Sequence, residues 1–211
     1  MSFLNRQNGM SLVEMLVSLV AGLVVVAGGI SLFTSVIVSG NTTLMLSRLN
    51  QDVQAVTDII ARDIQRAGYD PNAVALVGNS PPSASAYTFS TEKDLWPASP
   101  ATATCIRVKY RDTEEGANVG RIYSYIAASQ QLRVKDNSAS SALSSADCDT
   151  GGNQLVSSTE VVIDNLGFDL VSGSTPTGVR AVNIRISASN ARNPDLSISL
   201  ERRVKVRNDG Y

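Results

Sequence analysis

Glu14 is the only charged residue in a run of 29 residues, 10 to 38, that is otherwise almost entirely apolar. It follows Gly9 by five positions, and Gly9 closes a short polar leader. A carboxylate at the centre of a membrane span costs about 2.5–3.5 kcal/mol, and spanning a bilayer does not require one. The position therefore predicts a cationic partner for Glu14. The alternative is a carboxylate that snorkels to the membrane interface.

The apolar run is too long for an ordinary secretory signal, whose apolar stretch has about 7–15 residues before a small-residue cleavage site. We therefore expect a retained membrane span. Arg6 is the only basic residue of the leader, and the next positive charge is Arg48. This asymmetry predicts a cytoplasmic N-terminus and places the bulk of the chain outside. A plain single-pass anchor is the simpler alternative, but it explains neither Glu14 nor the helical pattern that follows.

A helical period continues beyond the apolar run and predicts one continuous helix from Met10 to Ala67, about 87 Å long. The other faces of this helix carry polar residues, among them Asp58, Arg62 and Asp63. Asp58 and Arg62 have the i,i+4 spacing of an ion pair on one helix. A coiled coil is the alternative, disfavoured because the pattern covers only about three heptads. The stripe that needs a protein surface comprises Leu46, Leu49, Val53, Val56, Ile60, Ile64 and Ala67.

Two segments carry a resemblance to a known family. The leader, Gly9, the apolar run and a glutamate at the fifth position after the glycine resemble the class III signal of type IV pilins and pseudopilins. The segment ARDIQRAGYDP, residues 61–71, resembles the end of the N-terminal helix in PilW-type minor pilins, to which the pseudopilin GspJ is related. Met10 departs from this pattern, because most relatives have phenylalanine there.

The resemblance implies cleavage by a prepilin peptidase between Gly9 and Met10, and methylation of the new N-terminus. It also implies that Glu14 pairs with the N-terminal amine of a neighbouring subunit, which fits the need of both charges for a partner in a medium of low dielectric constant. The full chain has 18 basic and 19 acidic residues, and cleavage removes Arg6. The mature chain would therefore have 17 basic and 19 acidic residues.

The implied fold is α+β and type IV pilin-like, a long N-terminal helix packed on a mostly antiparallel β-sheet domain. We expect a leader (1–9), a transmembrane and filament-core helix (10–38), an amphipathic continuation (39–68) and a globular periplasmic domain (69–211). The implied function is that of a minor pilin, a non-catalytic subunit that helps to prime type IV pilus assembly in a tip complex. A GspJ-like pseudopilin of a type II secretion system is the alternative.

The implied partners are the major pilin, other minor pilins, the prepilin peptidase and the inner membrane of a bacterium. The chain is expected to span this membrane once before it enters the pilus.

Gly68 and Pro71 mark the end of the helix. Cys105 and Cys148 are the only cysteines, so they allow one intrachain disulfide, which is the expected state beyond the membrane.

The remaining sequence predicts a β-rich domain. Short segments that alternate apolar and polar residues, or are rich in β-branched residues, are separated by Gly, Asn, Asp and Pro. This pattern favours an antiparallel meander and argues against a doubly wound α/β sheet. Residues 77–104 read as irregular loop with a short strand near 87–90, and 136–147 as a low-complexity excursion. The predicted strands cover 105–110, 121–127, 131–135, 160–171, 179–188 and 196–207.

No constellation of residues indicates catalysis. The absence of histidine weakens any triad or imidazole metal site, so we expect no enzyme activity, cofactor, metal or small-molecule substrate. Asp147, Asp149 and Asn153 offer oxygen atoms in a Gly-rich loop, but the calcium loop of an EF-hand is not matched. Basic residues around Arg203 and Lys205 suit a protected edge strand better than DNA, since no aromatic residues are interleaved.

Overall fold

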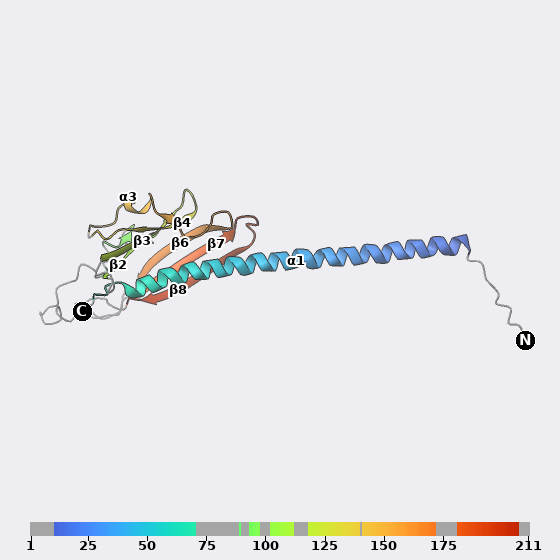
Figure 1. The fold of residues 1–211 in the computed structure, drawn as a ribbon, viewed down its shortest axis with the longest axis horizontal. Helices are drawn as coiled ribbons and strands as arrows, with labels where there is room; N and C mark the ends of the chain where they lie inside the picture. Colours follow the sequence, from blue (N-terminus) through green and yellow to red (C-terminus); the bar gives the residue numbers. More distant parts are fainter. Residues whose placement is uncertain are drawn as a thin grey trace, which may run out of the picture. The chain divides into compact units, whose positions relative to one another are not determined.

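The computed structural model describes residues 11–70, 89, 93–97, 102–111, 118–139, 141–171 and 181–206. The chain divides into two compact units, one ending at Leu44 and the other beginning at Met45. Helix α1 (Leu12–Arg66) runs through this boundary without a break. The strands and the C-terminal part of α1 belong to the second unit, and Figure 1 shows α1 lying across the strands there. The short strand suggested near 87–90 falls almost wholly outside the described residues.

Helix α1 begins and ends with local hydrogen bonds. The carbonyl oxygen of Ser11 accepts from the N–H groups of Glu14 and Met15, at 3.0 and 3.2 Å. At the other end Gly68 adopts φ +76°, a left-handed conformation that suits glycine after a helix. The Gly68 N–H then donates to the Lys109 carbonyl at 2.9 Å. The predicted helix end is therefore confirmed, and the chain is hydrogen-bonded to a strand where the helix stops.

The apolar stripe is confirmed over six of its seven residues. Leu49, Val53, Val56, Ile60, Ile64 and Ala67 are all buried. Leu46 is 41% exposed, so the packed stripe begins one turn later than predicted. Asp63 was expected on the polar side and is instead buried. The prediction was wrong there because an acid on the packed face can be satisfied by polar groups of the sheet, which periodicity does not reveal.

The strands form two antiparallel sheets where the sequence predicted a single meander. Sheet A has the order β1-β2-β3-β4-β5 and sheet B the order β6-β7-β8. Ala103 and Phe168 exchange backbone hydrogen bonds of 2.7 and 3.2 Å, which joins the start of β2 to β6. The strands are β1 (Leu95–Trp96), β2 (Cys105–Arg111), β3 (Asn118–Ile126), β4 (Gln131–Asp136), β5 (Asn153–Gln154), β6 (Val161–Val171), β7 (Ala181–Asn190) and β8 (Ser197–Lys205).

The six predicted strands all exist, with ends that differ by a few residues. In β7, Val182, Ile184 and Ile186 are buried while Arg185 is exposed, so the predicted alternation is confirmed. The two-residue strands β1 and β5 and the short helix α3 (Ser145–Cys148) were not predicted. Such short elements depend on neighbours distant in sequence and have no period of their own.

Sheet A is covered on both faces. Buried residues of α1 share one core with Tyr123 and residues of both sheets. On the opposite face Cys105, Ile122 and Cys148 form a second small cluster, against which Trp96 and Leu143 pack. The covering segment is the strap, which we define as residues 137–139 and 141–148. The sequence that read as a low-complexity excursion thus covers part of this face, with Cys148 buried and Leu143 partly buried against it.

Candidate functional site

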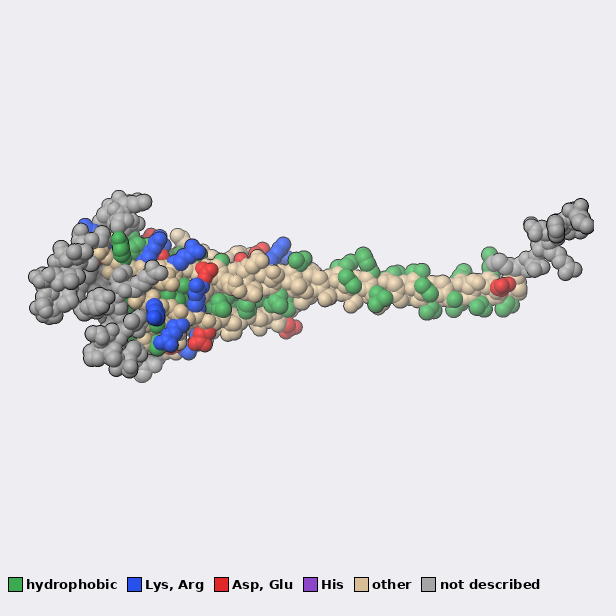
Figure 2. All heavy atoms as spheres, turned by 90° about the horizontal axis from the view of Figure 1, so that it is seen from below, with side chains coloured by type: hydrophobic (Ala, Val, Ile, Leu, Met, Phe, Trp, Pro, Cys, Tyr) green, Lys and Arg blue, Asp and Glu red, His purple; other side chains and the backbone are tan. Residues whose placement is uncertain are grey.

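The N-terminal part of α1 presents apolar side chains on every side. Residues 11 to 41 are all exposed, and among the described helices α1 is the one that is long and apolar enough to cross a membrane. In Figure 2 hydrophobic side chains point outward all along this part of the helix, whereas Lys and Arg side chains gather over the globular part. A surface of this kind is stable only in lipid or against other apolar helices.

Glu14 lies in the first turn of this helix, where the partial positive charge of the helix N-terminus favours a carboxylate. Its side chain is exposed and has no ion-pair partner within the described part of the chain. The Ser18 hydroxyl donates to the Glu14 carbonyl oxygen at 2.7 Å, which involves the backbone and leaves the carboxylate available. Gly9 and Met10, the other two residues singled out by the sequence, lie outside the described residues.

Asp63 joins α1 to sheet A. Its Oδ2 accepts a 2.5 Å hydrogen bond from the Tyr123 hydroxyl and a 3.1 Å charged hydrogen bond from Arg121, both on β3. Burial, together with the hydrogen bond to Asp63, raises the pKa of Tyr123 above its ordinary value. The helix period places Asp63 on the same face as Ile60 and Ala67, so its position could have been inferred from the sequence, whereas its partners on β3 could not.

We expect Asp63→Ala to destabilise the domain by about 1–3 kcal/mol, because the buried Tyr123 hydroxyl then has no acceptor. Urea unfolding of the detergent-solubilised protein measures this loss. Gln65→Ala, a half-exposed position on the same helix, is the control and should cost only a few tenths of a kcal/mol. Equal unfolding midpoints for Asp63→Ala and wild type would contradict the role assigned to this contact.

The same contact predicts a pH dependence. In the unfolded chain Tyr123 ionises near its ordinary pKa of about 10, whereas in the folded chain it stays protonated to higher pH. A folded pKa above the unfolded one gives stability that is fully present below pH 10 and is lost as the pH rises beyond it. The unfolding free energy should therefore fall above pH 10, and the fall should be smaller in Tyr123→Phe.

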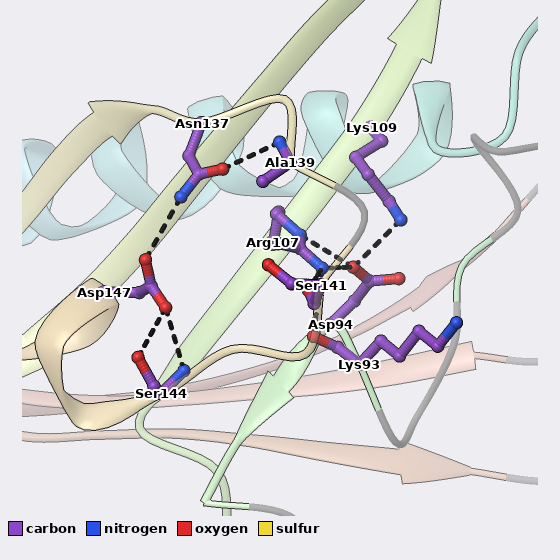
Figure 3. A network of polar contacts seen from close by, with 9 residues as sticks. All are labelled: Lys93, Asp94, Arg107, Lys109, Asn137, Ala139, Ser141, Ser144 and Asp147. Atoms are coloured by element: carbon purple, nitrogen blue, oxygen red, sulfur yellow. Dashed lines mark hydrogen bonds and ion pairs between the residues drawn. The ribbon is translucent and has the colours of Figure 1, made fainter.

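A buried ionic cluster lies under the strap, on the face of sheet A that is turned away from α1 (Figure 3). Arg107 and Lys109 of β2 contact Asp94 Oδ1 at 2.7 and 3.2 Å, and all three side chains are at most 7% exposed. The Arg107 Nη2 also donates to the carbonyl oxygens of Lys93 and Ser141, at 3.2 and 2.7 Å. One guanidinium therefore fastens β2, the segment before β1 and the strap to one another.

Three further contacts hold the strap. Cys148 forms the expected disulfide with Cys105, and the Asn137 N–H donates to the Gly120 carbonyl at 2.7 Å. The chain passes so close to Gly120 that a Cβ there would lie 2.0 Å from the Asn137 carbonyl oxygen, which explains the glycine. At the start of α3 the Ser144 backbone N–H donates to Asp147 Oδ2 at 3.0 Å as part of a capping box. The Ser144 hydroxyl donates to the same oxygen at 2.6 Å and holds the pKa of Asp147 below its ordinary value.

Replacing both cysteines by serine should lower the free energy of unfolding by about 2–5 kcal/mol, because the disulfide closes a loop with a sequence separation of 43 residues. Urea unfolding followed by fluorescence of Trp96, the only tryptophan, measures the loss at the strap itself. Ser145→Ala, which changes an exposed strap residue, is the control. An unchanged midpoint in the double variant would show that the strap gains no stability from the crosslink.

Several oxygen atoms in and beside the Gly-rich loop after α3 accept hydrogen bonds within the chain. The carbonyl oxygens of Thr150 and Gly151 accept hydrogen bonds from Lys135 and Arg133, at 3.0 and 3.4 Å. Asp147 is occupied by Ser144 and Asn137. Within the described ranges no three acidic or cysteine side chains are grouped to hold a metal ion. The acidic residues Asp112, Glu114 and Glu115, which the sequence places between two predicted strands, lie outside those ranges.

The helix, the two sheets and the N-terminal pattern define a type IV pilin-like protein. A family model of the prokaryotic N-terminal methylation motif matches residues 4–30, and the model described as prepilin peptidase-dependent protein B matches residues 42–206. Because the second match covers well over half of the chain, the protein belongs to the prepilin peptidase-dependent protein B family. Searches of curated proteins and of solved structures found no match.

Family membership establishes part of the expected function. The chain is a pilin-like protein that depends on prepilin peptidase, carries an N-terminal methylation motif, and has the single apolar N-terminal helix of a membrane-anchored pilin. Such families are generally structural and non-catalytic. The fold and family predicted from residues 9–14 and 61–71 are therefore confirmed.

Proposed function

We propose that this protein is a minor pilin, a non-catalytic subunit that helps to initiate type IV pilus assembly in a tip complex with other minor pilins. The observation that carries the proposal is the apolar surface of α1 and the continuity of this helix. Its N-terminal part exposes mostly apolar side chains and carries one charged residue, Glu14, and the same helix continues into the folded domain. A subunit with this helix can enter a bundle of similar helices while its domain contacts specific partners.

In the proposed mechanism, peptidase cleavage between Gly9 and Met10 creates a new N-terminal amine on the cytoplasmic side of the inner membrane. The amine and Glu14 then carry opposite charges near the end of one apolar helix. Within a helix bundle both need a partner, because an unpaired charge in a medium of low dielectric constant is costly. Pairing of Glu14 with the amine of the next subunit satisfies both charges and fixes the axial register of the two helices.

The processing step is testable by mass. Intact-mass analysis of the wild-type protein extracted from membranes should show loss of residues 1–9, and Gly9→Leu should retain them, since the peptidase must approach the scissile backbone closely. Asn8→Ala is the matched control and should be cleaved. A wild-type protein that keeps its leader would refute the cleavage site.

The assembly role is tested by cross-linking a tagged copy in its native membrane and identifying its neighbours by mass spectrometry. Recovery of the major pilin together with other minor pilins is the expected result. Recovery of secretion pseudopilins would favour a GspJ-like subunit of a type II secretion system instead. Recovery of neither class would overturn both assignments.

A further inference from the structure

Strand β8 is the long free edge of the domain. Its nine residues pair with β7 in nine consecutive pairs without a register shift. Within the described chain β8 has no backbone partner other than β7. The edges of sheet A, by contrast, are β1 and β5, which have two residues each, and β6 is bridged to Ala103. Short edges are a common protection against unwanted strand pairing, and β8 does not use it.

The C-terminal half of β8 carries positive charge on both of its faces. Arg203 and Lys205 are exposed and have no ion-pair partner among the described residues, whereas Arg202 on the other face pairs with Asp58 of α1. The cross-strand neighbours of Arg203 and Lys205 in β7 are the uncharged Asn183 and Ala181. Glu201 is the one acidic residue of the strand. The free edge is therefore cationic over its last four residues.

This pattern disfavours the two simplest pairings of β8 with a second copy of itself. Parallel pairing in register would place Arg203 opposite Arg203 and Lys205 opposite Lys205. Antiparallel pairing centred on the strand would place Glu201 opposite Glu201. Like charges directly opposite each other destabilise a sheet. An acidic segment opposite Arg203 and Lys205 offers a counter-charge to both cations, so the charges at this end of β8 favour an acidic partner.

We propose that the β8 edge is a docking site for an extended acidic segment of a partner protein, which adds a fourth strand to sheet B. Backbone hydrogen bonds along the nine residues supply the pairing, and Arg203 and Lys205 supply the preference for acidic side chains. The proposal does not depend on whether the protein acts in a pilus or in a secretion filament.

The test uses the full-length protein in detergent micelles and a fluorescent nine-residue peptide in which glutamate alternates with threonine or valine. Anisotropy should show saturable binding. Arg203→Glu with Lys205→Glu should weaken it at least tenfold, whereas Arg48→Glu with Arg192→Glu, an equal charge change at exposed cations elsewhere, should leave it within twofold. Far-UV circular dichroism checks that both variants are folded.

Two further peptides of the same sequence separate strand pairing from simple charge attraction. One is N-methylated at the odd-numbered amides and the other at the even-numbered amides. At least one of these two peptides should fail to bind, because methylation removes the backbone N–H groups that would donate to β8. Equal binding of all three peptides would overturn strand addition. Failure of the unmodified peptide to bind, or binding of duplex DNA through Arg203 and Lys205 in its place, would overturn the proposal as well.

Discussion

Glu14→Ala is expected to leave the protein cleaved and inserted in the membrane but to reduce its incorporation into filaments at least tenfold. The variant loses the only charge of the apolar part of α1, so insertion in lipid becomes easier. Within a helix bundle, however, the N-terminal amine of the neighbour then has no counter-charge, and an uncompensated buried charge costs about 3–5 kcal/mol. Immunoblots of sheared filaments and of membranes from the same cells give the two populations.

Two variants separate the charge from the shape of the side chain. Glu14→Gln keeps the size and the polarity but loses the charge, so it should resemble Glu14→Ala if ion pairing is the cause. Ser18→Ala removes only the hydroxyl that bonds the Glu14 carbonyl and should assemble normally. Wild-type levels of Glu14→Gln in filaments would contradict ion pairing and favour a carboxylate that merely lies at the membrane interface.

Arg107→Ala is expected to be the most destabilising substitution in the globular domain, by about 3–5 kcal/mol. It removes a buried ion pair with Asp94 and two partly buried hydrogen bonds to backbone carbonyls. Urea unfolding followed by Trp96 fluorescence measures the loss. Arg107→Lys keeps the charge but cannot reach all three partners with one rigid fork, so it should recover only part of the stability.

Arg185→Ala provides a matched comparison. Arg185 also pairs with an aspartate, Asp169, but its side chain is 49% exposed. Exposed ion pairs contribute at most about 1 kcal/mol, because water competes for both charges. Similar losses for Arg107→Ala and Arg185→Ala would mean that the cluster beneath the strap does not hold the domain together.

The parts of the fold that the sequence predicted are those with a local period. The helical stripe and the strand alternation around Ile184 repeat side-chain burial at 3.6 and 2 residues, so burial can be inferred from neighbours alone. Arg107 has no such signal. It is buried because Asp94, in a segment rich in Ser, Ala and Pro, supplies its counter-charge from 13 positions away. Only the folded chain brings these residues together.

The strap shows the same limit. Its composition, mainly Ser and Ala, predicts little apolar burial, and nothing in its local sequence indicates that it covers part of the sheet. Its order comes from tertiary contacts: the Arg107 side chain, the disulfide at Cys148 and the close approach of the chain to Gly120. The disulfide itself was accessible from sequence, because two cysteines allow only one pairing.

The continuity of α1 has a mechanical consequence. Helix α1 is a single element from Leu12 to Arg66, so tension along it reaches the residues that pack on the sheets. It enters through several sites together: the apolar stripe, the Asp63 hydrogen bonds to β3, the Asp58 contact with Arg202, and the Gly68 bond to Lys109. A pull shared in this way must break these contacts at the same time. The domain should therefore withstand a higher force than a domain that is pulled through a single attachment point.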